Sequence, residues 1–293
     1  MASNVFRIIT SDLKMSEHED LEVAILATDL DGTFIPLEGE PGNTTALQTF
    51  DEAARAGALS LVFVTGRHLE LVEDAINVHR LPRPNWIICD VGTSIYTCEP
   101  GGPFRPLEAY RAQLAELVHG MSVEDLADAL SVISTLRLQE PEKQGPFKLS
   151  YYVEQRFLET VASEVETVLV ESDAPYSLVQ SVDPFTNDGL IDLLPRGVSK
   201  AYALEWWCRH QGLEMENVVF AGDSGNDWAA LVAGYRAIVV GNAPSGLVER
   251  VREEHACRGY RDRLFIAAKP ATSGVLDGCK WFGLIDEQPA DSK

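Results

Sequence analysis

The sequence holds four short groups of polar residues whose types suit chemistry on a phosphate ester: Asp29 and Asp31, Thr65 and Gly66, Lys200, and Asp223 with Asp227. A carboxylate can attack phosphorus and form an aspartyl-phosphate. A second carboxylate can protonate the leaving alkoxide and then deprotonate the attacking water. A pair such as Asp29 and Asp31 could therefore provide both functions.

Such a site needs positive charge, because carboxylates repel a phosphate dianion. At about 4 Å and an effective dielectric near 20, each pair of like charges costs about 4 kcal/mol. Asp29 and Asp223, with the backbone carbonyl of Asp31 and waters, offer the hard oxygen ligands that Mg²⁺ prefers. Lys200 adds a fixed positive charge. Thr65 and the N–H group of Gly66 precede a predicted helix, whose N-terminus can accept phosphate oxygens.

The elements that must position these residues alternate between strand and helix. Short apolar runs that end in turn residues are typical of buried strands, and apolar residues at helical spacing indicate helices. We predict strands at 23–28, 59–64 and 86–90 with helices at 44–56 and 68–78, then a helix at 200–210, a strand at 218–221, a helix at 227–232 and a strand at 237–240. This order predicts a doubly wound parallel sheet, in which ligands bind at the carboxyl ends of the strands.

The middle of the chain breaks this alternation after a cluster of Pro and Gly residues at 100–106. Its predicted elements are two helices followed by a strand, a helix and two strands, at 110–119, 123–130, 148–153, 158–171, 176–182 and 190–194. We therefore predict an α+β cap domain at 104–194, inserted into a catalytic core at 23–103 and 195–293. Residues 1–22 form a polar leader without the apolar stretch of a signal peptide.

The bulk composition narrows the possible partners and compartments. The formal net charge of -21 makes nucleic acid or an anionic membrane surface a poor partner. No apolar run is long enough to span a bilayer. The five cysteines lack CxxC spacing, which favours a reducing compartment over a disulfide framework or a zinc site. We therefore expect a cytoplasmic protein, whereas its oligomeric state stays undetermined.

Taken in order, the polar groups resemble the four motifs of the haloacid dehalogenase-like phosphatases. The matching residues are 29–33 (DLDGT), 64–67 (VTGR), Lys200 and 222–227 (GDSGND), and the insert resembles the larger (C2-type) cap of that family. The resemblance covers most of the chain after residue 22. It implies that Asp29 is the nucleophile, Asp31 the general acid and base, and Asp223 a metal ligand. It also implies that Thr65, Lys200 and Asn226 bind phosphate, and that Asp227 supports the metal site or Lys200.

A narrower resemblance points to sucrose-phosphate phosphatase and related disaccharide-phosphate phosphatases. It rests on residues 146–152 (PFKLSYY), 192–195 (DLLP) with Ser199 and Lys200, and 222–227. It implies that Lys148 reaches the sugar from the cap. Phosphatases of glucosylglycerol, mannosylfructose or mannosylglycerate phosphates share most of these features, so the sugar stays open.

Plainer interpretations remain beside these roles. The acidic residues could cap helices or stabilise turns, Thr65 could be a helix N-cap, and Lys200 could be a solvated lysine. Lys148 is as readily a solvent-facing strand residue as a sugar ligand. Arg67 could bind substrate or pair with an acid on a helix. Asp90, at the end of the predicted strand 86–90, could equally be a turn or cap residue or a catalytic one. A phosphatase for another small phosphate, or a catalytically silent domain that binds sugar phosphates, would fit the same fold.

Overall fold

Two sheets organise the computed structural model, which describes residues 24–99, 101–183 and 186–286. The larger sheet has eight strands in the order β12-β11-β10-β1-β2-β3-β4-β5. Its strands are β1 (Ala24–Thr28), β2 (Leu59–Val64), β3 (Trp86–Cys89), β4 (Ser94–Cys98), β5 (Phe104–Pro106), β10 (Val218–Gly222), β11 (Arg236–Val239) and β12 (Leu264–Ile266). All neighbours from β12 to β3 are parallel, and β4 and β5 add an antiparallel edge.

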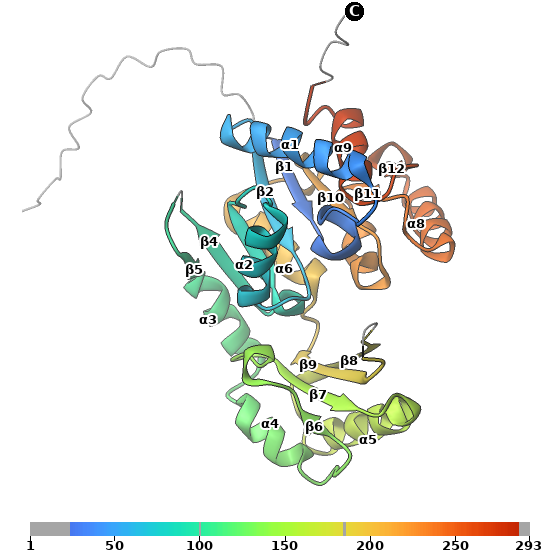
Figure 1. Ribbon diagram of the computed structural model, residues 1–293. Coiled ribbons are helices and arrows are strands. Elements are labelled where there is room, and N and C mark those ends of the chain that lie inside the picture. Colours follow the sequence, from blue (N-terminus) through green and yellow to red (C-terminus); the bar gives the residue numbers. More distant parts are fainter. Residues whose placement is uncertain (1–23, 100, 184–185, 287–293) are drawn as a thin grey trace, which may run out of the picture.

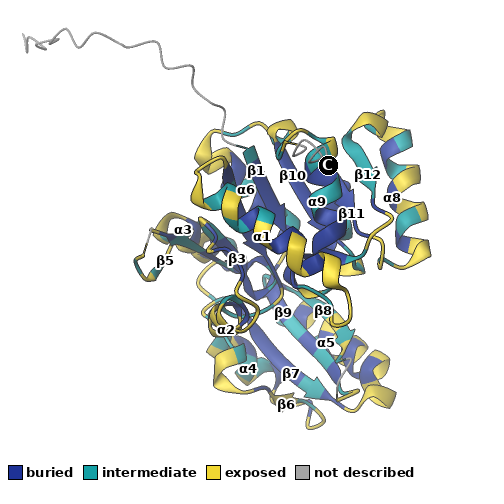
Figure 2. Cartoon of the chain, turned by 45° about the horizontal axis from the view of Figure 1, so that its top comes forward, coloured by how far each residue is buried: buried dark blue, intermediate teal, exposed yellow. Residues whose placement is uncertain are grey.

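Helices cover both faces of this sheet because its strands are apolar on both sides. On β2, Val62 and Val64 pack into one apolar cluster, whereas Leu61 and Phe63 pack into the other. The first face is covered by α3 (Glu108–Leu117), α6 (Lys200–Gln211), α7 (Trp228–Leu231) and α8 (Ser245–Arg258). The second is covered by α1 (Pro41–Arg55), α2 (Leu69–His79) and α9 (Ala271–Trp281). Figure 2 shows the central strands β1, β10 and β11 buried between these layers.

The smaller sheet belongs to the insert and lies beside the core in Figure 1. It is antiparallel with the order β6-β7-β9-β8. Its elements are α4 (Val123–Leu130), β6 (Arg137–Leu138), β7 (Leu149–Val153), α5 (Leu158–Glu171), β8 (Tyr176–Val182) and β9 (Gly189–Pro195). They enclose an apolar cluster of their own. The prediction of a doubly wound core with an inserted α+β cap is confirmed.

The limits expected for the insert, 104 and 194, stay a prediction, and two strand pairings bear on where they lie. Phe104–Pro106 pairs with β4 in the core sheet, and Pro195 pairs with Tyr176 in the cap sheet. We therefore propose to place the first boundary after α3, which packs on the core sheet, and the second after Pro195, rather than at 104 and 194. The leader 1–22 and Val23 lie outside the described residues. Within those residues, no helix has the length and apolar character needed to cross a bilayer.

Candidate active site

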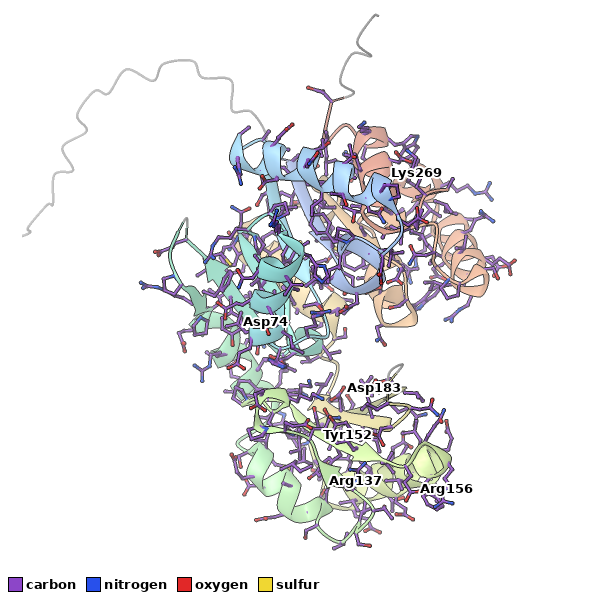
Figure 3. The ribbon with its side chains drawn as sticks, viewed as in Figure 1. Asp74, Arg137, Tyr152, Arg156, Asp183 and Lys269 are labelled. Atoms are coloured by element: carbon purple, nitrogen blue, oxygen red, sulfur yellow. The ribbon has the colours of Figure 1, made fainter. Side chains whose placement is uncertain are left out.

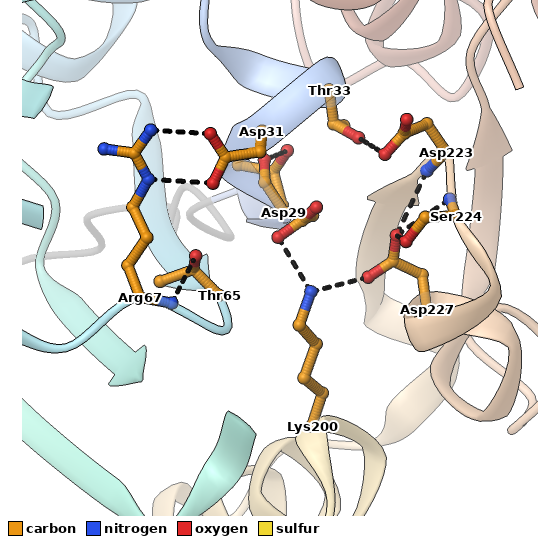
Figure 4. Close-up of polar contacts among 10 residues, drawn as sticks. Asp29, Asp31, Thr33, Thr65, Arg67, Lys200, Asp223, Ser224 and Asp227 are labelled. Carbon is orange, nitrogen blue, oxygen red and sulfur yellow. Dashed lines mark hydrogen bonds and ion pairs between the residues drawn. The ribbon is translucent and has the colours of Figure 1, made fainter. Parts of the chain in front are cut away.

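The predicted residues converge at the carboxyl ends of three neighbouring strands. Asp29 follows β1, Thr65 follows β2, and Asp223 follows β10, and the sheet order places β1 between the other two. The backbone N–H of Asp29 donates to the carbonyl of Ala221 at 2.9 Å, which ties the end of β1 to β10. Figure 4 shows these side chains, with Lys200 approaching from α6.

Lys200 lies at the centre of the site. Its Nζ donates to Asp29 Oδ1 at 2.8 Å and to Asp227 Oδ1 at 2.9 Å, and all three side chains are buried. The lysine starts α6 directly after the N-cap Ser199, whose hydroxyl accepts from the N–H of Tyr202. The solvated-lysine interpretation is therefore wrong. Burial lowers the pKa of Lys200, but Asp29 and Asp227 outweigh it and leave that pKa raised.

Asp227 organises the loop after β10. Its Oδ2 accepts from the N–H groups of Asp223 and Ser224 at 3.2 and 3.1 Å, and from the Ser224 hydroxyl at 3.0 Å. Because its other oxygen holds Lys200, this fully buried carboxylate fixes both the loop and the ammonium group. Gly222 permits the arrangement, since a Cβ there would lie 2.7 Å from the Asp227 Cβ. The supporting role expected for Asp227 stays a prediction.

The Asp223 side chain contacts two other segments of the chain, the first motif and the turn after β11. Its Oδ1 accepts from the Thr33 hydroxyl at 3.0 Å. Asn242, in the turn after β11, donates to the carbonyl of Gly32 at 2.8 Å and lies 3.5 Å from Asp223 Oδ2. Asn242 is not among the candidates named above from the sequence, where its only signal is its position in a turn directly after the predicted strand 237–240.

Asp29, Asp223 and Asp227 form a compact acidic cluster, with one oxygen of each within 4.8 Å of the others. Burial, and next the charge of Asp227, raise the pKa of Asp29 to about 7, although Lys200 acts in the opposite direction. Burial and Asp227 also raise the pKa of Asp223 to about 6. One ammonium therefore offsets too little of the negative charge, and a divalent cation with oxygen ligands fits the residues present.

Asp31 lies differently from the other acids. Its carboxylate is largely exposed and accepts two hydrogen bonds from Arg67, from Nε at 2.8 Å and from Nη2 at 2.6 Å. The metal contact expected of Asp31 is through its backbone carbonyl, and that contact stays a prediction. Arg67 is thus paired with an acid of the first motif, which lies in the helical turn Leu30–Phe34, and a contact of Arg67 with substrate stays a prediction.

The remaining phosphate-binding candidates surround this centre. The buried Thr65 donates its N–H to Ile88, and its hydroxyl accepts from the N–H of Arg67 at 3.2 Å. Gly66 and Asn226 are exposed, in the loop after β2 and in the turn Gly225–Asp227 respectively. No acceptor is found for the Thr65 hydroxyl proton among the described residues, and phosphate binding by Thr65, Gly66 and Asn226 stays a prediction.

Lys148, the cap candidate, precedes β7 and is buried, so the interpretation as a solvent-facing residue is wrong. Its Nζ lies 3.8 Å from Asp192 Oδ1 of the cap and 3.8 Å from Asp90 Oδ1 of the core. Lys148 therefore lies where the cap meets the core.

Comparison with known proteins places this geometry in a family. The family model "Sucrose-6F-phosphate phosphohydrolase" matches residues 22–283. A protein of Nitrosococcus oceani described as a HAD-like hydrolase is 35% identical over 265 residues, covering 88% of this chain and 71% of that protein. The mannosylfructose-phosphate phosphatase of Agrobacterium fabrum is 28% identical, and the match covers 89% of this chain and 97% of that protein.

Solved structures agree on the fold. The sucrose-phosphatase of Synechocystis, determined with sucrose and phosphate, superposes with a TM-score of 0.68 at 23% identity. The match covers 89% of this chain and 98% of that one. At this identity the likeness shows the fold, including the cap.

Proposed function

Because the chain belongs to the sucrose-6F-phosphate phosphohydrolase family and is a phosphatase, we propose that it is a Mg²⁺-dependent enzyme that hydrolyses sucrose 6-phosphate or a related disaccharide phosphate. The observation that carries the proposal is the buried Lys200, which is hydrogen-bonded to both Asp29 and Asp227. A buried lysine between two carboxylates, after β1 and after β10, adds little net stability to the fold, because removing these charges from water is costly. It suits a site that must accept a phosphate dianion.

In the proposed reaction, Asp29 attacks phosphorus while Asp31 gives its proton to the departing sugar oxygen, which leaves an aspartyl-phosphate. Asp31 then takes a proton from water, and the water oxygen attacks the phosphoryl group. Inorganic phosphate leaves, and the Asp29 carboxylate is restored. Lys200, Thr65, the Gly66 N–H and Asn226 bind the phosphate oxygens during both steps.

The metal would be held by Asp29, Asp223 and the backbone carbonyl of Asp31. When bound, Mg²⁺ neutralises charge on the phosphate and favours the ionised form of the carboxylates around it. Asp227 and Thr33 hold Asp223 in place. We assign Mg²⁺ because the donors are all oxygen atoms and lie on short, hydrogen-bonded loops, which suit its strict geometry.

Sugar identity is tested with a panel of substrates. Phosphate release should be measured with and without Mg²⁺ on sucrose 6-phosphate, mannosylfructose phosphate, glucosylglycerol phosphate, mannosylglycerate phosphate and hexose phosphates. We expect Mg²⁺-dependent turnover with a disaccharide phosphate as the preferred substrate. Preference for a different small phosphate would correct the substrate alone, whereas binding without turnover would show a catalytically silent domain.

A further inference from the structure

The turn after β3, residues Asp90–Gly92, has a left-handed backbone conformation, which residues other than glycine rarely adopt. Its three φ angles are 51°, 58° and 98°. The middle residue is Val91, and a β-branched residue with positive φ is a genuine outlier. Such conformations persist only where the surroundings impose them. The turn is therefore held in place by its neighbours.

Those neighbours are the loops of the active site. The N–H of Asp90 donates to the carbonyl of Arg67 at 2.9 Å, and the N–H of Val91 donates to the carbonyl of Thr65 at 3.3 Å. On the other side, a Cβ on Gly92 would lie 2.3 Å from the carbonyl oxygen of Ser199. The turn thus packs between the loop after β2, which carries Thr65 and Gly66, and the start of α6.

The Asp90 side chain points from this turn toward the cap. Its carboxylate is 9% exposed, and Oδ1 lies 3.8 Å from the Nζ of Lys148, whose side chain is 8% exposed. Oδ2 lies 3.6 Å from the sulfur of Cys89, which donates to it. Among the described residues, Oδ1 has no hydrogen-bond donor. Within that part of the chain, the ammonium group of Lys148 is therefore the one ion-pair partner of this carboxylate, while His68 and Ser94 also favour its ionised form.

Lys148 has a second carboxylate nearby, but that acid is engaged within the cap. Asp192 Oδ1 lies 3.8 Å from Nζ and also accepts from the Ser150 hydroxyl at 2.5 Å. Asp192 fixes the lysine relative to the cap sheet, whereas Asp90 fixes it relative to the core. Burial raises the pKa of Asp90, and the charge of Lys148 opposes that rise, which agrees with a direct electrostatic link between the two residues.

We propose that Asp90 is a positioning residue that holds Lys148 in place over the active site and so determines sugar recognition from the core side. The proposal rests on the proposed function and on the role in sugar binding that the resemblance to disaccharide-phosphate phosphatases implies for Lys148. Because the Asp90 backbone is bonded to the loop that carries Thr65, the pairing sets the distance between the cap lysine and the phosphate site. Sugar selectivity then depends on a core residue as well as on the cap.

The kinetic test compares Asp90→Asn, Lys148→Ala, the double variant and a control, Asp188→Asn. Asn keeps the shape of Asp and tolerates positive φ well. The control removes a carboxylate that forms an exposed ion pair with Arg137, which lies on the cap in Figure 3. The substrates are the sugar phosphate that the wild type prefers and ethyl phosphate, which is too small to reach the cap. Both have an alkoxide leaving group.

We expect Asp90→Asn to raise KM for the sugar phosphate about tenfold, the lower range for a lost charged contact, with kcat nearly unchanged. Ethyl phosphate should change less than about twofold, and Asp90→Glu, which keeps the charge, should recover most of the loss. In the Lys148→Ala background, Asp90→Asn should cost nothing further. Additive losses would overturn the proposal by showing that Asp90 touches the sugar itself. Equal losses on both substrates would overturn it by showing a purely structural role.

A substrate-free readout keeps this test separate from the identity of the sugar. Acetylation of Lys148 by an amine-reactive ester, followed by mass spectrometry, measures how firmly the core holds the lysine. We expect faster labelling in Asp90→Asn than in the wild type or Asp188→Asn. Unchanged labelling would overturn the pairing, even if no sugar phosphate proves to be a substrate. Faster labelling without any sugar preference would contradict only the proposed function.

Discussion

The guanidinium group of Arg67 forms a bidentate ion pair with the carboxylate of Asp31, through Nε at 2.8 Å and Nη2 at 2.6 Å. Arg67 also donates to the carbonyl of Leu71 at 3.2 Å, which anchors it to α2. The arginine of the second motif therefore fixes the direction of an acid in the first. Planar two-point pairing is a property of arginine that lysine cannot reproduce.

We expect Arg67→Lys and Arg67→Met to lower kcat, because the proposed general acid would lose its orientation. The pair is partly exposed, so the loss should be modest, about three- to thirtyfold. It should be larger for ethyl phosphate than for 4-nitrophenyl phosphate, whose leaving group needs little protonation. Steady-state rates on the two substrates check this. Equal losses on both would contradict a role for Arg67 through Asp31.

The nucleophile is tested by Asp29→Asn. The amide cannot attack phosphorus, so turnover should fall about a thousandfold or more. The fold should persist, because Lys200 keeps its bond to Asp227. Thermal unfolding followed by circular dichroism should show an unchanged or higher Tm, since an acid whose pKa is raised by burial and Asp227 is removed. Retention of more than a few per cent of wild-type activity would rule out the covalent mechanism.

The raised pKa values of Asp29 (about 7) and Asp223 (about 6) predict a pH-dependent effect of metal on stability. Both folded values lie above the ordinary value of 3.8. Between that value and about pH 7 the folded metal-free protein therefore binds more protons than the unfolded chain. By linkage, these two groups make the metal-free protein less stable as pH rises through that window.

Mg²⁺ should reverse this loss by favouring the ionised carboxylates. The rise in Tm on adding Mg²⁺ should be small near pH 5 and should reach several degrees near pH 8, as expected for about 2.7 kcal/mol at a hundredfold excess over Kd. EDTA should abolish activity, Mg²⁺ should restore it, and Ca²⁺ should support it poorly, because its looser coordination misplaces the carboxylate. A Tm shift independent of pH, or full activity in excess EDTA, would contradict the site.

Gly32 offers a separate test of the metal ligand. Its φ is 73°, and a Cβ there would lie 2.4 Å from Asp223 Oδ2. Gly32→Ala should therefore displace Asp223 and weaken Mg²⁺ activation about tenfold or more, which a titration of activity against Mg²⁺ would measure. Gly39→Ala is the matched control, because Gly39 has a φ of 83° but no neighbour within 4 Å. Equal effects of both substitutions would assign the loss to backbone strain.

The sequence was sufficient to predict which residues meet in the core of the site. Asp29, Thr65 and Asp223 each follow an apolar run, and the ends of neighbouring parallel strands lie on one edge of a sheet. The strand-helix alternation is therefore enough to predict that these three residues lie close together. It could not reveal the partners of the side chains, such as Arg67 with Asp31 or Asp90 with Lys148, because those contacts join residues 36 and 58 positions apart.

Helix α9 shows why the C-terminal part of the chain was not assigned. Gly274 and Gly278 lower its helix propensity, by about 1 kcal/mol each relative to Ala. The structure explains both residues through packing. A Cβ on Gly278 would lie 2.5 Å from Ile238 of β11, and one on Gly274 would lie 2.3 Å from the carbonyl of Lys269. Close packing of Gly278 on the sheet and of Gly274 on the loop before the helix thus accounts for glycines that local helix propensity disfavours.

The last prediction concerns Lys148 and separates the cap from the core. The lysine is buried beside Asp192 and Asp90, so its ammonium group is held in a fixed place. A charged hydrogen bond to a sugar hydroxyl contributes about 1.5–3 kcal/mol. Lys148→Ala should therefore lower kcat/KM for the preferred sugar phosphate by about ten- to a hundredfold.

A phosphate ester too small to reach the cap, such as ethyl phosphate, should lose far less activity on the same substitution. Lys143→Ala is the matched control, because Lys143 also lies in the cap but pairs with Glu140 and Tyr152 at a partly exposed position. It should leave both substrates within about twofold, the range of a weak surface pair. Equal losses on both substrates in Lys148→Ala would show that the lysine acts on the fold or on the chemistry. No loss on either would remove Lys148 from sugar recognition.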